Sequence, residues 1–169
     1  MRYILFVCML VISCANHQQR IKSDIYLTEA NNRKIGTVWF KDTFNGLLVE
    51  VSLTNLPQGK HGFHVHEYPD CAAVTNKNGQ IEFAHKAGGH YDPYKTGKHL
   101  GPNGGGHLGD LPYLMVDSDG SVKRKFYIKN VKVKDFKNRS IMIHSGGDNY
   151  KDNPLPLGGG GKRIACGII

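Results

Sequence analysis

Seven residues of this chain have the types and the spacing of metal ligands. They lie in the segments HGFHVHE, AGGHYDP, GKHLGP, GHLGD and IMIHSGG, and they are His64, His66, His90, His99, His107, Asp110 and His144. One such histidine would be weak evidence, because a lone buried histidine is often only a hydrogen-bonded core residue. Six histidines in these contexts are hard to explain as packing, and they predict a paired metal site.

His64 and His66 are two residues apart in a run that predicts a strand. Side chains two apart on a strand point to the same face, whereas Phe63 and Val65 point to the opposite face and into the core. Two imidazoles on one face of a rigid strand make half of a preorganised metal site. The isolated HxH pattern is a weak signal, and the neighbouring candidates strengthen it.

The candidates divide into two sets by ligand chemistry. Three imidazoles and one carboxylate suit tetrahedral Zn²⁺, and they come from His90, His99, His107 and Asp110. Four imidazoles suit copper that cycles between Cu(II) and Cu(I), and they come from His64, His66, His90 and His144. One histidine must serve both sets. His90 is the natural choice, because an imidazolate can bind one metal at each nitrogen.

The elements that position these residues are predicted to be strands. The chain has 169 residues, the size of one domain, and much of its high glycine content of 21 residues lies in loops. After the hairpin signal Asn45-Gly46, apolar residues alternate with less apolar ones from Leu47 to Thr54. Similar runs predict strands at 25–30, 34–40, 47–54, 61–67, 113–117, 121–128, 138–145 and 163–169. We expect an all-β, eight-stranded Greek-key sandwich or flattened barrel, with no convincing helix and two long functional loops at about 68–112 and 146–162.

The first residues predict export. Arg2 and an apolar stretch from Tyr3 to Ile12 resemble a signal peptide, and Val-Ile-Ser-Cys-Ala resembles the lipobox of bacterial lipoproteins. We therefore expect a removed signal at 1–13, a lipid on Cys14, a tether at 14–22 and a domain at 23–169. An ordinary signal peptide cut nearby is the alternative. Residues beyond this segment include no apolar run long enough to cross a membrane.

The cysteines predict one disulfide. Cys8 lies in the signal segment and Cys14 is the lipid candidate, which leaves Cys71 and Cys166 as a pair in an oxidising compartment. A bridge between them would close a long loop, and it would stabilise the fold by about 4–5 kcal/mol in the loop-entropy model.

The net charge of +8 is compatible with nucleic acid, anionic lipid or a small anion as partner. The basic residues are densest in KRKFYIKNVKVKDFKNR at 123–139, and no nucleic-acid motif accompanies them. We therefore interpret this run as solvated strand faces and expect no nucleic-acid partner.

Together, the segments resemble those of bacterial Cu,Zn superoxide dismutases. The matching strings are GKHGFHVHE, AGGHYDP, TGKHLGP, GHLGDLP, MIHSGGDNY and PLGGGGKRIACGII, and the resemblance covers about residues 24–169. It implies the same copper and zinc ligand sets and the Cys71–Cys166 disulfide. It implies superoxide as substrate: one superoxide reduces Cu(II) and leaves as O₂, and a second reoxidises Cu(I) and leaves with two protons as hydrogen peroxide. Such an enzyme would protect the cell envelope, in the periplasm, from superoxide formed outside the cytoplasm.

The resemblance also implies roles for residues outside the ligand sets. His90 would leave copper on reduction and take up a proton, and Arg163 would orient the anion at the copper mouth. Asp148 would link a copper-bound and a zinc-bound histidine, with Asp152 as the competing candidate. Lys162, beside Arg163, is one of several lysines that could steer superoxide.

Alternatives to the enzyme are a non-catalytic metal-binding module of the same fold and a basic surface-binding lipoprotein. The sequence is compatible with a homodimer as well as with a monomer.

Overall fold

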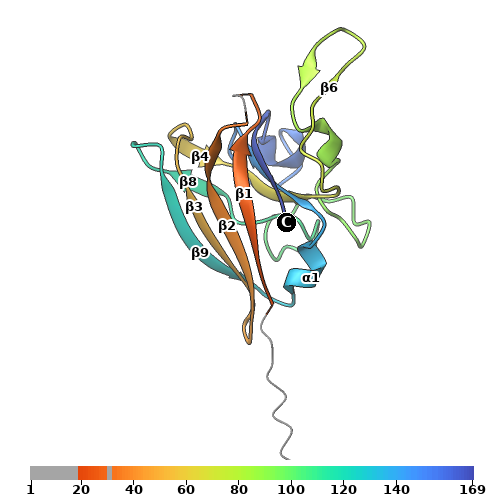
Figure 1. Cartoon of the computed structure of the whole chain (residues 1–169). Helices are drawn as coiled ribbons and strands as arrows, with labels where there is room; N and C mark the ends of the chain where they lie inside the picture. Colours follow the sequence, from red (N-terminus) through yellow and green to blue (C-terminus); the bar gives the residue numbers. More distant parts are fainter. Residues whose placement is uncertain (1–18, 30–31) are drawn as a thin grey trace, which may run out of the picture.

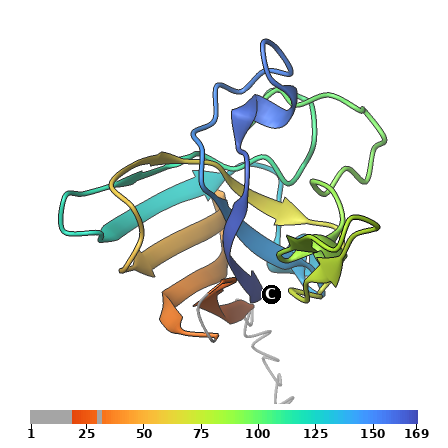
Figure 2. The same cartoon turned by 90° about the horizontal axis from the view of Figure 1, so that it is seen from above.

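The central element of the computed structural model is an antiparallel sheet of seven strands that curls on itself (Figures 1 and 2). The structure describes residues 19–29 and 32–169. The strand order is β5-β10-β11-β1-β2-β3-β9. Strands β9 and β3 are neighbours in space and distant in sequence, as are β11 and β1, which is typical of Greek-key folds. The prediction of an all-β, flattened barrel is confirmed.

The strands lie close to their predicted positions. Their bounds are β1 (Arg20–Leu27), β2 (Lys34–Thr43), β3 (Gly46–Leu53), β4 (Gly59–His61), β5 (Phe63–His66), β6 (Val74–Thr75), β7 (Ile81–Glu82), β8 (Leu114–Val116), β9 (Val122–Ile128), β10 (Ser140–His144) and β11 (Arg163–Ile168). Eleven strands are therefore present in the described residues, against the eight expected. The run 61–67 was expected as one strand, but β4 pairs with β8 and β5 pairs with β10. The hairpin β6–β7 lies inside the first long loop and was not predicted.

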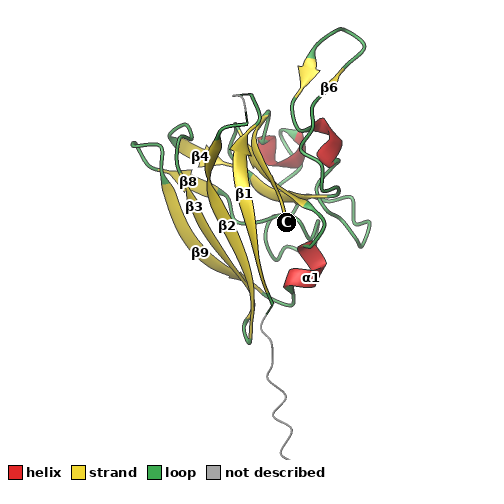
Figure 3. Cartoon of the chain, in the orientation of Figure 1, coloured by secondary structure: helices red, strands yellow, loops and turns green. Residues whose placement is uncertain are grey.

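In the described part of the chain, helices are few and short (Figure 3). They are α1 (Val133–Phe136) and the 3₁₀ helices η1 (His85–Ala87) and η2 (Pro156–Gly159). The expectation of no helix was wrong at these three places, because four residues or fewer cannot produce a readable helical period. Among the described residues, no helix is long and apolar enough to cross a membrane.

The β2–β3 hairpin shows how the alternating sequence forms the core. Leu47, Val49, Val51 and Leu53 are all at most 3% exposed, as their period of two predicts. The turn itself consists of Phe44 and Asn45. Gly46 has a positive φ of 113°, and a Cβ there would collide with the backbone oxygen of Ile128 on β9. Glycine is therefore required by the close approach of β9.

The sheet begins earlier than the sequence predicts. Arg20, Ile21 and Lys22 pair with Lys41, Phe40 and Trp39 of β2, so the last three residues assigned to the tether are part of β1. The polar side chains of this segment obscured its strand character, because they lie on the outer face of the sheet. The signal segment and Cys14 lie outside the described residues.

Candidate metal centre

Strands β5 and β10 carry three of the seven candidate ligands. His64 and His66 lie on β5, and His144 ends the neighbouring strand β10, where its N–H donates to the Gly62 oxygen at 2.9 Å. The first long loop is held against β5 by isolated bridges that pair His64 with Asp110 and His66 with His90. These backbone pairs explain how a loop of this length is ordered and brings its side chains to the strand histidines.

The four residues predicted to bind copper form one buried cluster. The ligand atoms of His64, His66, His90 and His144 all lie within 4.8 Å of one another. The Nε2 atoms of His66 and His144 are 3.4 Å apart, and the rings of His64 and His90 stack at 4.0 Å. Four imidazole nitrogens that converge on one point can hold a transition metal ion.

The four residues predicted to bind zinc also come together, around Asp110. Its Oδ1 lies 2.9 Å from Nδ1 of His90 and 3.4 Å from Nδ1 of His107, and its Oδ2 lies 2.9 Å from Nδ1 of His99. On this side, the ligand atoms of His64, His90, His99 and Asp110 all lie within 4.8 Å of one another, and His107 is not part of this group. His90 belongs to both clusters, as the ligand count requires.

Several buried ligand atoms of the clusters have no hydrogen-bond partner. They are Nδ1 of His64, Nδ1 of His99, Nδ1 of His107 and Oδ2 of Asp110. Nδ1 of His99 is close to Oδ2 of Asp110, but the two atoms do not have hydrogen-bond geometry. Each buried polar atom without a partner costs about 1–3 kcal/mol, and a bound cation would satisfy such atoms together. The donor set therefore fits two metal ions.

Burial keeps the copper-type histidines neutral. It lowers the pKa values of His66 and His144 far below the usual value, with further lowering by neighbouring histidines. It lowers the pKa of His90 to about 4, with the proximity of His64 as the second cause. Metal binding requires the neutral imidazole, so this environment favours the ligand form.

His99 behaves differently from the copper-type histidines. Burial acts to lower its pKa, but Asp110 and Asp148 outweigh burial and raise the pKa to about 9. The two carboxylates therefore favour a positive charge at this position. A proton supplies that charge in the metal-free chain, and a metal cation beside Asp110 would supply it in its place.

Asp148 lies between the two clusters and accepts a hydrogen bond from a histidine of each. Its Oδ2 accepts a hydrogen bond from Nε2 of His64 at 2.7 Å, and its Oδ1 accepts one from Nε2 of His99 at 2.8 Å. Asp152 instead accepts a hydrogen bond from the backbone N–H of His99 at 3.0 Å. The carboxylate of Asp148 therefore turns the Nδ1 atoms of both histidines toward the clusters.

Backbone carbonyls orient the other copper-type imidazoles, and sequence reasoning missed these groups. Nδ1 of His66 donates to the Gly88 oxygen at 3.0 Å, and Nδ1 of His144 contacts the Gly161 oxygen at 3.3 Å. Each contact leaves Nε2 free to face the cluster. Carbonyl groups have no sequence signature, although glycines on both loops were a hint of close backbone approach.

Arg163 lies at the mouth of the copper-type cluster. It lines a cleft of about 250 Å³ together with His66, His90 and His144. Its guanidinium donates to the oxygens of Ala84 and Gly88 at 2.7 and 2.6 Å. These carbonyls fix a positive charge beside the histidines, in a position to attract a small anion.

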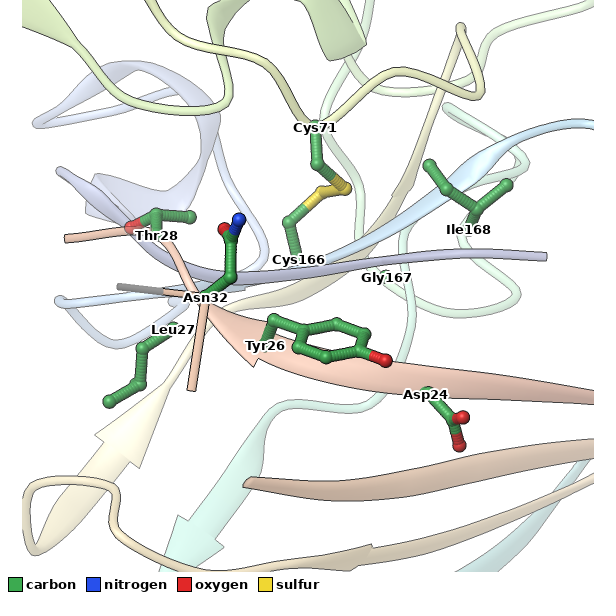
Figure 4. A pocket seen from close by; sticks show the side chains of 9 residues that line it. All are labelled: Asp24, Tyr26, Leu27, Thr28, Asn32, Cys71, Cys166, Gly167 and Ile168. Carbon is green, nitrogen blue, oxygen red and sulfur yellow. A yellow bond between two sulfur atoms is a disulfide. The ribbon is translucent and has the colours of Figure 1, made fainter. Parts of the chain in front are cut away.

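The predicted disulfide is present between Cys71 and Cys166. It joins the first long loop to β11, the strand that begins with Arg163, and it therefore ties the carbonyls that hold Arg163 to the sheet. Figure 4 shows the bridge in a separate cleft of about 410 Å³, lined by Asp24, Tyr26, Leu27, Thr28, Asn32, Cys71, Cys166, Gly167 and Ile168. None of these lining residues belongs to the metal-ligand sets.

The fold and the two clusters define a class of protein: an all-β barrel whose loops bring two adjacent ligand sets together at one shared histidine. Comparisons agree with this class. The model of the copper/zinc superoxide dismutase (SODC) family matches residues 34–169. The chain is 50% identical over 138 residues to a Cu-Zn superoxide dismutase of Brucella abortus, which covers 81% of this chain and 79% of the relative. It is 41% identical over 171 residues to the Escherichia coli K12 enzyme, which covers 99% and 98%.

Solved structures agree as well. The Cu/Zn superoxide dismutase from Brucella abortus superposes with a TM-score of 0.84 at 45% identity and covers 89% of this chain and 99% of its own. The monomeric enzyme from Salmonella enterica superposes with a TM-score of 0.77 at 45% identity, with the same coverage. The chain belongs to the copper/zinc superoxide dismutase family. Its reaction is the dismutation of superoxide, and its cofactors are copper and zinc.

Proposed function

We propose that His64, His66, His90 and His144 hold the copper ion and that His90, His99, His107 and Asp110 hold the zinc ion. The observation that carries this assignment is the set of buried ligand atoms without partners. The unpartnered Nδ1 of His64 lies on the copper side, and the other three atoms lie on the zinc side. Copper would supply one-electron redox chemistry, and zinc would fix the geometry of the shared histidine.

In the reaction, Arg163 attracts and orients the superoxide anion. Its guanidinium lines the cleft with His66, His90 and His144, and its carbonyl partners prevent it from swinging away. His90 holds a proton at Nε2 in one half of the cycle and delivers it to the product in the other half. Its Nδ1 stays directed at Asp110, at 2.9 Å, so the ring keeps its place while the proton moves.

Selective metal loss tests the assignment. Replacing His144 with Ala removes a copper ligand that has no part in the zinc set, and replacing His107 with Ala removes a zinc ligand only. Metal analysis should find that His144→Ala retains zinc and loses copper, and this variant should no longer consume superoxide. His107→Ala should lose zinc more readily than copper. A His144→Ala protein that loses zinc and retains copper would overturn the assignment.

We also propose that the chain is exported, that Cys14 carries a lipid, and that the enzyme protects the cell envelope from superoxide. The disulfide supports an oxidising compartment, and the Val-Ile-Ser-Cys-Ala sequence supports lipid attachment. Replacing Cys14 with Ser should release the protein from membranes that are washed in high salt, which screens reversible electrostatic binding. Unchanged fractionation would exclude the anchor. The sequence allows a homodimer as well as a monomer, and sedimentation of the purified protein at several concentrations would distinguish them.

A further inference from the structure

A fully exposed aromatic side chain lies at the end of the barrel where the described chain begins. Phe44, in the turn between β2 and β3, is as exposed as in an extended chain, at 101%. Two residues before it, the N–H of Asp42 donates to the Gln19 oxygen at 2.9 Å. The β2–β3 turn and Gln19, the first described residue, therefore lie at the same end of the sheet, where β2 runs into β3 (Figure 1).

Basic residues lie close to this aromatic tip in the sheet. Lys41 pairs with Arg20 across the strands, Lys129 follows β9 with its backbone against Gly46, and Nζ of Lys132 donates to the Thr43 oxygen at 2.9 Å. The basic run 123–139, which supplies two of these lysines, contains eight Lys and Arg residues and one Asp. None of the residues of this run belongs to the metal-ligand sets.

The acidic groups at this end are engaged by the backbone. Oδ1 of Asp42 accepts a hydrogen bond from the N–H of Val133 at 2.7 Å, and Oδ2 of Asp135 accepts one from the N–H of Lys132 at 2.8 Å. Farther up the sheet, Glu50 lies near Arg20 and Lys125. Four cations, Arg20, Lys41, Lys129 and Lys132, therefore outnumber the three acids Asp42, Asp135 and Glu50, and two of these acids point toward backbone N–H groups.

The chain outside the structure limits how far this end can be from a membrane. Cys14, the proposed lipid site, is five residues before Gln19. Five residues span at most about 18 Å when fully extended. The intervening sequence Ala-Asn-His-Gln contains no acidic residue that would repel an anionic surface.

We propose that this end of the barrel, formed by Phe44, Lys41, Lys129 and Lys132, docks onto an anionic lipid surface. An isolated exposed phenylalanine is common on soluble proteins and needs no explanation. Here Phe44 follows Thr43, whose oxygen accepts a hydrogen bond from Lys132, and it lies at the end of the sheet where Gln19 begins the described chain. An aromatic ring with a basic surround matches the apolar and anionic layers of a bilayer interface. The proposal gives the anchored protein an orientation on the membrane. It rests on the proposed lipid at Cys14, because the limit on the distance between this end and the membrane is counted from that residue.

Docking in this way directs the copper mouth away from the lipid. At the far end of β1, the hydroxyl of Thr28 donates to the Arg163 oxygen at 2.7 Å, so Arg163 lies opposite the Arg20 end. Eight residues of strand span about 25 Å, well beyond the screening length of about 8–10 Å. The negative potential of the bilayer therefore does not repel superoxide from Arg163.

Depth-dependent quenching tests the proposal. The chain has one tryptophan, Trp39, so Phe44→Trp adds a single reporter at the tip. On vesicles of phosphatidylglycerol and phosphatidylcholine that contain brominated acyl chains, Phe44→Trp should lose a larger fraction of its tryptophan fluorescence than wild type does. The matched control is Ile81→Trp, on the distant β6–β7 hairpin, where the native side chain is 60% exposed. Equal quenching of the two variants, or none of Phe44→Trp, would overturn the proposal.

The Cys14→Ser form separates docking from lipid anchoring. This form should bind the anionic vesicles reversibly, and it should not bind pure phosphatidylcholine vesicles. Adding Phe44→Ser, or Lys129→Ser with Lys132→Ser, should weaken binding at least about tenfold, whereas adding Lys77→Ser on the distant hairpin should not. If wild type remains on membranes but the Cys14→Ser form does not bind the anionic vesicles, the lipid anchor is supported and the docking proposal fails. If Cys14→Ser leaves membrane fractionation unchanged but the vesicle series behaves as expected, only the anchor fails.

Discussion

Replacing Asp148 with Asn probes the link between the two metal sites without changing the shape of the side chain. Asp148 accepts hydrogen bonds from Nε2 of His64, Nε2 of His99 and the N–H of Tyr150, at 2.7, 2.8 and 2.7 Å. All three groups are donors, and a carboxylate can satisfy all of them. An amide has one acceptor oxygen, so in either orientation its NH₂ group faces an N–H donor.

The size of the effect follows from these contacts. A hydrogen bond to a charged group contributes about 1.5–3 kcal/mol, and Asp148→Asn loses at least one such bond in a buried site. Groups that orient metal-bound histidines typically change metal affinity by about 10–100-fold, or about 1.4–2.7 kcal/mol, which is the same range. Because one carboxylate orients His64 and His99, we expect both copper and zinc affinity to fall.

Competition with a chelator measures this effect. Metal-free wild type, Asp148→Asn and Asp152→Asn would each be titrated with zinc, and then with copper, against a chelator of known affinity. Asp152→Asn is the matched control, because its amide oxygen can still accept from the backbone N–H of His99. The reasoning is refuted if Asp148→Asn binds both metals within twofold of wild type, or if Asp152→Asn is impaired as strongly.

Three further predictions concern residues around the site. Cys71→Ser should lower the free energy of unfolding by about 4–5 kcal/mol in denaturant titrations, and reduced wild type should match it. Arg163→Ala should lower kcat/KM for superoxide by about tenfold or more, and the kcat/KM of Arg163→Lys should lie between those of wild type and Arg163→Ala. An Arg163→Lys variant as slow as Arg163→Ala would contradict a role of the positive charge. Gly158→Ala should weaken metal binding and destabilise the fold by more than about 1 kcal/mol. The φ of Gly158 is 72°, and the added Cβ would overlap Asp148 and crowd His99. Zinc titration and thermal unfolding would measure the two effects.

Much of the fold was readable because strand signals are local. The alternation from Leu47 to Leu53 predicted a half-buried strand, and the structure buries all four apolar residues. The β6–β7 hairpin and α1 were missed, because elements of two to four residues carry no measurable period. The start of β1 was missed because Arg20 and Lys22 are polar, and only their pairing with β2 makes them part of the sheet.

The residue types of the site were also determined by the sequence. Metal coordination requires particular atoms, so six histidines and one aspartate predicted a paired metal site, and ligand counting selected His90 as the shared residue. Cysteine accounting gave the Cys71–Cys166 bridge in the same way.

Tertiary structure alone decided the orientation of these side chains. The choice of Asp148 over Asp152 depends on contacts with His64 and His99, which are 84 and 49 residues away in the chain. The carbonyls that hold Arg163, and the position of Phe44 beside Gln19, likewise depend on how distant segments meet. A sequence states which atoms are available for coordination and hydrogen bonding, but the packing of loops onto strands determines which of these atoms face one another.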